Sequence, residues 1–349
     1  MTLRVTFASY DDSPPLGGQG VMLQGMRTAL ERRGVRTDTV AGRGDHAVRY
    51  PTVLRRAPLD LSLYLNQHPS MLMRGSPDVV HAHGGPGGVL LLRRPRVPLV
   101  YTAHHTYAQA HPRGSAWRLP APLEARSYRL ATMVLPVSPS TAAAVRAMGI
   151  PSSRIEVVPP GVDVPEADDA AREAARVLFV GRLRRDKGVL DAIDVMRALV
   201  EERADVRGVV IGDGALADEV RARVGREPRI EIRGAADASE VKREYARASL
   251  LLVPSRYEGL GLVALEGQAA GTPVVGYDVD GLRHAVVDGG VLVPAGDAEA
   301  LRAAAVALLQ DDARRRELGE RGRAFVRERH SWDRTAERLE QIYAALAHA

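Results

Sequence analysis

The sequence contains no cysteine and no long apolar run. Without cysteine the chain can form neither disulfide bonds nor thiolate metal sites, which is typical of a cytosolic protein. Its uninterrupted apolar stretches are all far shorter than the ~20 residues that a membrane-spanning helix needs. The opening, MTLRVTFASY, has no signal-peptide pattern and leads directly into a strand. We therefore expect a cytoplasmic protein with no transmembrane segment.

Lysine and aromatic residues are also scarce. Only Lys187 and Lys242 are lysines, so 46 of the 48 basic residues are arginines, and aromatic residues make up 4%. The net charge of +5 would suit an anionic partner, but the arginines are spread along the whole chain, with few aromatic residues among them. We therefore expect no nucleic-acid binding. The arginines would still allow peripheral contact with the inner surface of a membrane.

Strand and helix patterns alternate through both halves of the 349 residues. A strand over 3–9, a glycine-rich loop over 11–20 and a helix over 21–33 open the first series, and a second series begins with a strand over 176–180. The polar, acidic stretch 164–175 between the two series has no core pattern, which predicts a linker. Such alternation is typical of doubly wound domains with parallel sheets. We predict an α/β protein of two Rossmann-like domains.

Some stretches are harder to assign. The arginine-rich stretch 41–76 has no clear period, and residues 107–120 are loop-like. A short strand is expected over 155–158. The last stretch has the apolar spacing of an amphipathic helix, with Ser331 as its N-cap.

Gly17, Gly18 and Gly20 lie between the first predicted strand and the first predicted helix. Glycine lets the backbone approach a ligand closely, and free amides at a helix N-terminus favour phosphate. Glycines are equally common as plain turn residues. The pattern alone therefore leaves both interpretations open.

The most informative stretch is Pro254–Pro273, PSRYEGLGLVALEGQAAGTP. It follows the apolar run 250–253, which predicts a buried parallel strand, and it continues into a helical pattern. Glu258 falls in the loop at the carboxyl end of that strand and Glu266 early in the helix. Open α/β sheets bind ligands at this edge. Carboxylates beside free amides suit a ligand with both hydroxyls and phosphate, such as a sugar nucleotide.

This stretch resembles the E-x7-E signature of the retaining glycosyltransferases of the GT-B fold, family 4. A pair of glutamates at this spacing is common on surface helices, but EGLGLVALEGQAAGTPVV as a whole is similar to the family's pattern. The resemblance spans nearly the whole chain and implies two facing Rossmann-like domains. Residues 1–163 would bind the acceptor and 176–330 the nucleotide sugar, with 164–175 as the linker. The helix over 331–349 would cross back to the first domain.

The resemblance also implies roles for individual residues. Arg182 and Lys187, in GRLRRDKG, match the basic pair that holds the donor's diphosphate, and they would stabilise the leaving group in place of a metal ion. Glu266 is expected to accept hydrogen bonds from the ribose hydroxyls, and Glu258 to lie near the donor sugar and its phosphates. Backbone groups expected to meet the donor belong to Gly17, Gly18, Gly259, Leu260, Gly261 and Leu262.

His104 ends the segment VYTAH, which is similar to the V-x-T-x-H strand end of the family. There the imidazole faces the donor sugar, so His104 joins Arg182, Lys187 and Glu258 in the expected catalytic set. A histidine at a strand end is also a common structural residue. His81 and His83 point to one face of a strand and, with His104 and His105, could gather as metal ligands. The family has D-V-V-H-x-H here without a metal, so we expect no metal site.

By resemblance, the protein is expected to be a retaining, metal-independent glycosyltransferase. It would move a hexose from a nucleoside-diphosphate sugar, with UDP- and GDP-sugars favoured, to a hydroxyl of a glycolipid, a glycan or a small natural product. No cofactor is expected besides this co-substrate. Two alternatives stay open. One is a sugar-nucleotide epimerase or hydrolase on the same fold, or a metal hydrolase that uses the histidines. The other is a non-catalytic sugar-nucleotide-binding protein.

Overall fold

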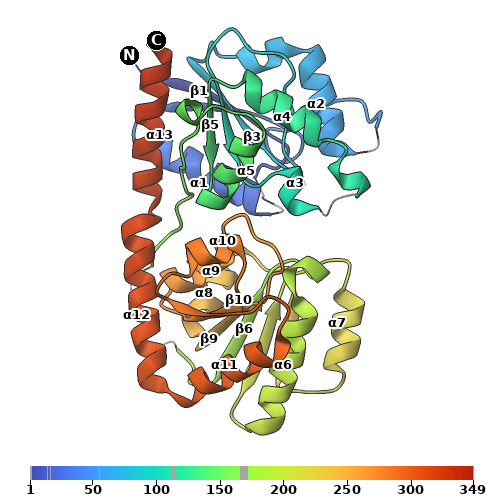
Figure 1. Cartoon of the computed structure of the whole chain (residues 1–349), viewed down its shortest axis with the longest axis vertical. Coiled ribbons are helices and arrows are strands. Elements are labelled where there is room, and N and C mark those ends of the chain that lie inside the picture. Colours follow the sequence, from blue (N-terminus) through green and yellow to red (C-terminus); the bar gives the residue numbers. More distant parts are fainter. Residues whose placement is uncertain are drawn as a thin grey trace. The chain divides into compact units, whose positions relative to one another are not determined.

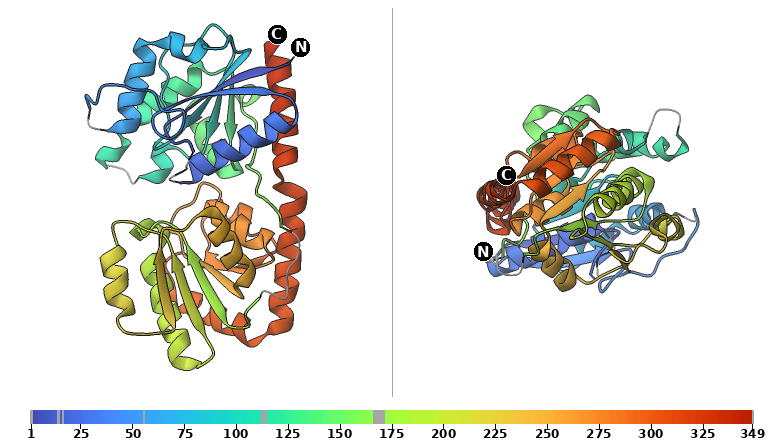
Figure 2. Two further views of the ribbon diagram at one scale, coloured as in Figure 1. Left: turned by 180° about the vertical axis from the view of Figure 1, so that it is seen from behind. Right: turned by 90° about the horizontal axis from the view of Figure 1, so that it is seen from below.

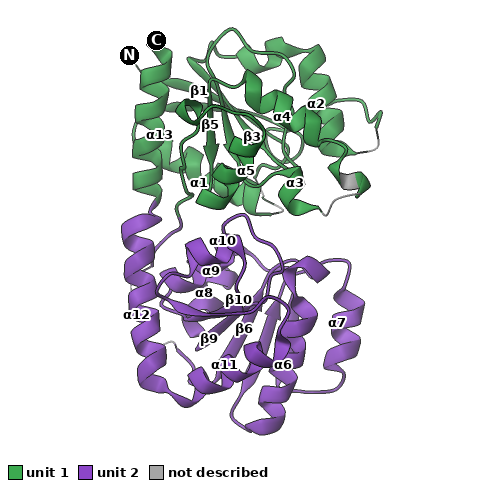
Figure 3. Cartoon of the chain, in the orientation of Figure 1, with its two compact units in different colours: residues 1–161, 332–349 green, residues 162–331 purple. Residues whose placement is uncertain are grey.

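The computed structural model describes residues 2–13, 15, 17–54, 56–111, 115–165 and 172–348, except the side chain of Trp117. The chain divides into two compact units, and Figure 3 colours them separately: residues 1–161 with 332–349, and residues 162–331. Each unit is a parallel β-sheet with helices on both faces (Figure 1). The predicted α/β architecture of two Rossmann-like domains is confirmed. Half of the linker predicted over 164–175, residues 166–171, lies outside the described residues.

Unit 1 contains a five-stranded parallel sheet in the order β2-β1-β3-β4-β5. Its strands are β1 (Arg4–Ser9), β2 (Arg36–Ala41), β3 (Val79–Gly84), β4 (Leu99–Ala103) and β5 (Met133–Pro136). Its α-helices are α1 (Gly18–Arg32), α2 (Ala57–Gln67), α3 (Tyr107–Ala110), α4 (Ala121–Leu130), α5 (Pro139–Ala147) and α13 (Trp332–Ala347). The strand order changes direction between β1 and β3. The loops that follow these two strands diverge there, which is where open α/β sheets bind ligands.

Helices α2 and α4 pack on one face of this sheet, and α1 and α13 on the other. Helix α13 lies beside α1 (Figure 1 and Figure 2), and the indole ring of Trp332 rests on Gly25. A Cβ atom at Gly25 would lie only 2.0 Å from that ring, so the close approach of the two helices requires glycine there. The last helix and the first strand therefore belong to the same unit.

Unit 2 contains a six-stranded parallel sheet in the order β11-β10-β9-β6-β7-β8. Its strands are β6 (Arg176–Val180), β7 (Arg207–Ile211), β8 (Ile230–Gly234), β9 (Leu250–Val253), β10 (Val274–Tyr277) and β11 (Gly290–Val293). Its α-helices are α6 (Val189–Glu202), α7 (Ala217–Val224), α8 (Ala238–Arg247), α9 (Leu262–Ala269), α10 (Asp280–Ala285), α11 (Ala298–Gln310) and α12 (Asp312–Arg329). Here the strand order changes direction between β6 and β9. A second switch point therefore lies between the loops that follow these two strands.

The sheet of unit 2 is buried on both faces, which explains why its central strands are continuous apolar runs. All four residues of β9 are buried. Helices α6, α7 and α11 cover one face, α8, α9 and α10 lie on the other, and α12 packs on α9. The buried residues of α6 recur at three- and four-residue spacing, so one stripe of this helix faces the sheet.

Three details differ from the sequence predictions. The segment expected as a strand over 155–158 forms one isolated bridge, between Ile155 and Val134. The amides of Glu156 and Val158 still donate to carbonyls of β5, at 3.1 and 3.0 Å, and Pro159 and Pro160, which lack an amide hydrogen, end this pairing. Helix α1 begins three residues before the predicted start. The unassigned stretch 41–76 contains α2 and a 3-10 helix, Pro69–Met73, and the loop-like stretch that follows β4 contains α3 and a 3-10 turn, Ala116–Arg118. In the part of the chain that the structure describes, no helix is long and apolar enough to cross a bilayer.

Candidate functional site

The loops that follow β6 and β9 lie side by side at the carboxyl edge of the unit 2 sheet. The amide of Arg256 donates to the carbonyl of Asp186 at 2.9 Å. Gly188, with a φ of +67°, lies so close to Pro254 that a Cβ atom would be 1.9 Å from its carbonyl oxygen. Only glycine satisfies both conditions. The fold thus joins the two sequence segments that carry the predicted donor-binding residues, and it does so at the switch point of the sheet.

Lys187 and Glu258 meet at this junction. Lys187 Nζ lies 2.6 Å from Glu258 Oε1, although the two residues are 71 positions apart in the sequence. Ser255 Oγ donates to the same carboxylate oxygen at 2.8 Å. The side chains of Lys187 and Glu258 are only 22% and 14% exposed, so the ion pair is stronger than one fully in water. The structure therefore places a partly shielded, bonded cation at the predicted position.

The other basic side chains of the same loop divide into two kinds. Arg184 and Arg185 pair with Asp186 and Glu219, at 2.8 and 3.2 Å. Arg182 is exposed, and its guanidinium has no hydrogen-bond or ion-pair partner among the described residues. A guanidinium left unpaired beside a bonded lysine is available to an anionic ligand.

Glu266 lies in a different environment. Its Oε2 accepts a hydrogen bond of 2.9 Å from the hydroxyl of Tyr245 on α8, and no direct contact joins it to Glu258. The pKa of Glu266 is raised to about 7, mainly by burial; the hydrogen bond from Tyr245 and the charge of Lys242 partly oppose this, and the nearby carboxylate of Asp163 adds a smaller increase. Lys242 itself forms an ion pair of 2.7 Å with Asp163. One carboxylate oxygen of Glu266 is held in place, and the other has no hydrogen-bond partner among the described residues.

The backbone between the two glutamates ends in a helix N-terminus. Gly261, with a φ of +86°, is the N-cap of α9, which begins at Leu262. No described residue accepts a hydrogen bond from the amides of Gly259, Leu260, Gly261 or Leu262. These amides form a group of free donors next to the Lys187–Glu258 pair in the same loop.

Gly17 and Gly18, the two glycines of unit 1 that are expected to meet the donor, have different surroundings. Gly17 is the N-cap of α1, and its amide donates to Asp11 Oδ2 at 3.1 Å. Asp11 is buried and also bound by Arg43 at 2.5 Å. Gly18 is the first residue of the helix, so its amide points out of the N-terminus. A ligand at this end of α1 meets an amide together with a carboxylate that is already paired with a guanidinium.

His104 lies directly after β4 and is buried, with 8% of its surface exposed. Its Nε2 is 3.0 Å from Nδ1 of His83, which is fully buried on β3. His81, on the same strand, is bonded at both ring nitrogens, to Thr102 Oγ1 at 2.8 Å and to the Tyr343 hydroxyl of α13. Burial lowers the pKa of all three imidazoles, that of His81 to about 3, so they are neutral at pH 7.

This arrangement bears on the metal-cluster alternative. The lone pairs that a metal would need are largely taken, since both nitrogens of His81 are hydrogen-bonded and His83 and His104 bond each other. Within the described ranges, no three side chains of metal-binding type gather as ligands would.

Sequence reasoning missed the residues that hold the predicted ones in place. Ser255 lies three residues before Glu258 in the same loop, so this contact is local in the sequence. Tyr245 carries no such local signal. It reaches Glu266 only because α8 packs beside α9.

Comparison with known proteins agrees with the fold and the site. The family model for glycosyl transferases group 1 matches residues 174–311, and that for glycosyltransferase family 4 matches residues 16–166. A D-inositol 3-phosphate glycosyltransferase of Xylanimonas cellulosilytica is 37% identical, over 76% of this chain and 72% of the relative. These matches favour a transferase over the epimerase, hydrolase and non-catalytic alternatives.

Solved structures show the same fold. A sucrose-phosphate synthase from Thermosynechococcus elongatus has a TM-score of 0.80 at 20% identity, over 99% of each chain. HepE of Anabaena, solved in complex with UDP and glucose, has a TM-score of 0.73 at 18% identity, over 99% of this chain and 100% of that one. The predicted GT-B fold is confirmed. The two family models together cover both halves of the chain, and one relative is 37% identical over 76% of it. The chain therefore belongs to family 4 of the GT-B glycosyltransferases.

Proposed function

We propose that the protein transfers a hexose from a nucleoside-diphosphate sugar to an acceptor hydroxyl, with retention of configuration and without a metal ion. The observation that carries the proposal is the cluster at the switch point of unit 2. There the Lys187–Glu258 pair and the free amides of the β9–α9 loop lie at the edge where such folds bind their ligands, and the unpaired Arg182 lies in the same loop as Lys187. The complex of HepE with UDP and glucose supports the same class of donor.

The chemistry follows from where negative charge develops. The bond between the anomeric carbon and the phosphate oxygen breaks, and its electron pair goes to the leaving diphosphate. Lys187, now bonded to Glu258, and the unpaired Arg182 would hold this charge by hydrogen bonds that strengthen as the bond breaks. The acceptor oxygen forms the new bond on the same face of the sugar, and its proton passes to the leaving phosphate. No side chain needs to act as nucleophile.

The two glutamates divide the remaining work. Glu266, held by Tyr245 through one oxygen, would accept from the ribose hydroxyls of the nucleotide with the other. Glu258 would lie near the sugar and exchange its bond with Lys187 for sugar hydroxyls when the diphosphate draws the ammonium away. We assign donor binding to unit 2 and acceptor binding to unit 1.

A thermal-shift panel tests the donor class. One of UDP-, GDP-, ADP- or dTDP-glucose is expected to raise the melting temperature of the full chain, because a ligand at 100 times its Kd stabilises the folded state by about 2.7 kcal/mol. Free glucose and inorganic phosphate, at the same concentrations, serve as controls that should leave the melting temperature unchanged. If none of the four sugar nucleotides shifts it at millimolar concentration, the proposed donor is wrong.

The affinity for the sugar nucleotide is expected to fall by up to ~10-fold as the pH is lowered from 8 to 6. With a pKa of about 7, Glu266 is mostly ionised at pH 8 and mostly protonated at pH 6. Only the ionised carboxylate can accept hydrogen bonds with both oxygens, because the protonated form carries an O–H donor. A sugar nucleotide has no group that titrates in this range, so calorimetric titration reports on the protein. Glu266→Gln should bind weakly at both pH values. A pH-independent Kd in the unaltered protein would contradict the assignment of Glu266.

A further inference from the structure

The hydrogen bond between His83 and His104 determines which nitrogen of His104 carries its proton. His83 Nδ1 and His104 Nε2 lie 3.0 Å apart, and both rings are buried and neutral. A neutral imidazole has one N–H group and one bare nitrogen, so one ring must donate and the other accept. Two forms of this hydrogen bond are therefore possible. In one, His83 Nδ1 donates to His104 Nε2, and in the other His104 Nε2 donates to His83 Nδ1.

The opposite nitrogen of His83 distinguishes the two forms. His83 Nε2 is buried and has no partner among the described residues, while its neighbours include the ring of Phe7 and that of His81, whose nitrogens are both already bonded. If His104 donated, His83 would have to keep its proton on Nε2 as an orphaned N–H group. If His83 donates, only a bare lone pair is left there. Orphaned buried N–H groups are among the rarest defects in native proteins, which favours the second form.

We infer that His83 is a positioning residue that donates from Nδ1 to His104 Nε2 and thereby fixes His104 as the Nδ1–H tautomer. His104 Nδ1 has no partner among the residues that the structure describes, and it is not one of the buried orphan atoms. The free edge of His104 is thus a hydrogen-bond donor. It suits an oxygen acceptor, such as a sugar hydroxyl or a phosphate oxygen of the donor.

This inference deepens the proposed function and rests on it for its meaning. A His104 that presents an N–H group cannot take the proton of the acceptor hydroxyl through that nitrogen. The base must then be another group, which agrees with the leaving phosphate in that role. His81, fully bonded on the same strand, would only hold β3 to β4 and to α13.

Nitrogen NMR of the full chain, labelled with ¹⁵N-histidine, tests the tautomer directly. Long-range ¹H–¹⁵N spectra distinguish protonated from bare ring nitrogens, and the spectrum of His104→Gln assigns the His104 signals. We expect a protonated Nδ1 and a bare Nε2 for His104, and the same for His83. A protonated Nε2 on His104, or an imidazolium at pH 7, would overturn the inference. This readout needs no donor and no turnover, so it is independent of the proposed function.

Two variants at residue 83 test the positioning role. His83→Asn keeps a donor close to the position of Nδ1, and it should retain the His104 tautomer and the wild-type rate of nucleotide release from the donor. His83→Leu removes the donor and should lower that rate on the order of 10-fold, as loss of an orienting partner does.

A wild-type rate in a folded His83→Leu would overturn the positioning role of His83, while the proposed function would stand. If that variant fails to fold, the spectra of the wild type and His83→Asn decide alone. If the wild type itself binds no sugar nucleotide, the proposed function fails, and the tautomer is still decided by its spectrum.

Discussion

Replacing Lys187 by alanine is expected to lower the rate of sugar transfer by ~100- to 1000-fold, the usual cost of removing one charge-stabilising donor at a reacting centre. The ammonium is placed by the loop after β6 and is held 2.6 Å from Glu258. Without it, the leaving diphosphate keeps only Arg182 and the loop amides. The melting temperature should change little, because Ser255 still bonds Glu258 at the edge of the sheet. Release of nucleoside diphosphate from the donor found by the thermal-shift panel measures the rate.

Arg185→Ala is the matched control for this prediction. Arg185 lies in the same loop, two residues before Lys187, but it is 74% exposed and pairs with Glu219. Its removal should change the rate less than 2-fold, since exposed ion pairs contribute ~0–1 kcal/mol and the side chain of Arg185 makes no hydrogen bond or ion pair with Lys187 or Glu258 among the described residues. A Lys187→Ala protein that turns over at the rate of Arg185→Ala would remove Lys187 from the site.

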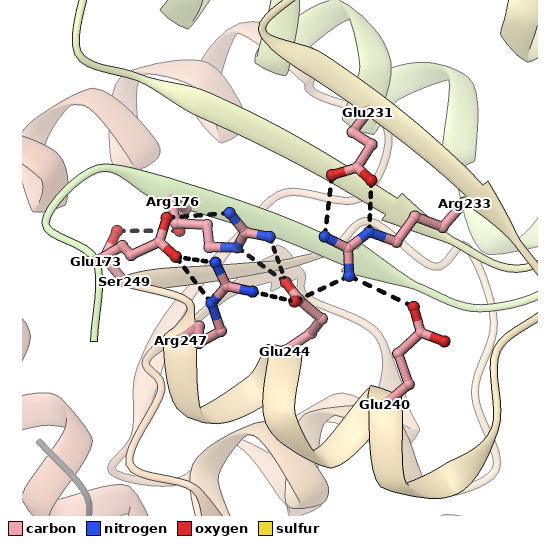
Figure 4. A network of polar contacts seen from close by, with 8 residues as sticks. All are labelled: Glu173, Arg176, Glu231, Arg233, Glu240, Glu244, Arg247 and Ser249. Atoms are coloured by element: carbon pink, nitrogen blue, oxygen red, sulfur yellow. Dashed lines mark hydrogen bonds and ion pairs between the residues drawn. The ribbon is translucent and has the colours of Figure 1, made fainter. Parts of the chain in front are cut away.

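Replacing Glu244 by alanine is expected to lower the free energy of unfolding by ~3–5 kcal/mol. Figure 4 shows this buried carboxylate among three guanidinium groups. It accepts from Arg176 at 2.7 and 2.9 Å, from Arg233 at 2.9 Å and from Arg247 at 3.1 Å. Removing one partner leaves uncompensated charge in a place that water reaches poorly, and Arg176 is itself buried.

Urea unfolding, followed by circular dichroism, measures this loss, and Glu231→Ala is its control. Glu231 binds Arg233 through both oxygens in the same network, but its side chain is 55% exposed, so its removal should cost less than ~1 kcal/mol. Because Tyr245 follows Glu244 on α8, a loosened helix would also release Glu266. Equal stability of Glu244→Ala and Glu231→Ala would show that the network does not hold α8 in place.

The sequence by itself determined the class of fold and the edge of each sheet where chemistry is expected. The periods of strand and helix are local, and parallel strands put the loops after them at one edge, so the position of Glu258 after β9 and of Lys187 after β6 could be predicted. The family resemblance added the expected roles. The continuous apolar run of β9 needed no tertiary information, because only a strand covered on both faces tolerates it.

Only the tertiary structure decided which of these residues meet. The order β11-β10-β9-β6-β7-β8 makes β6 and β9 neighbours, and this adjacency joins Lys187 to Glu258. The bonds of Tyr245 to Glu266 and of His83 to His104 depend likewise on which helix and strand lie side by side. No local period records strand order or helix neighbours, because both are set by the burial of whole faces against each other.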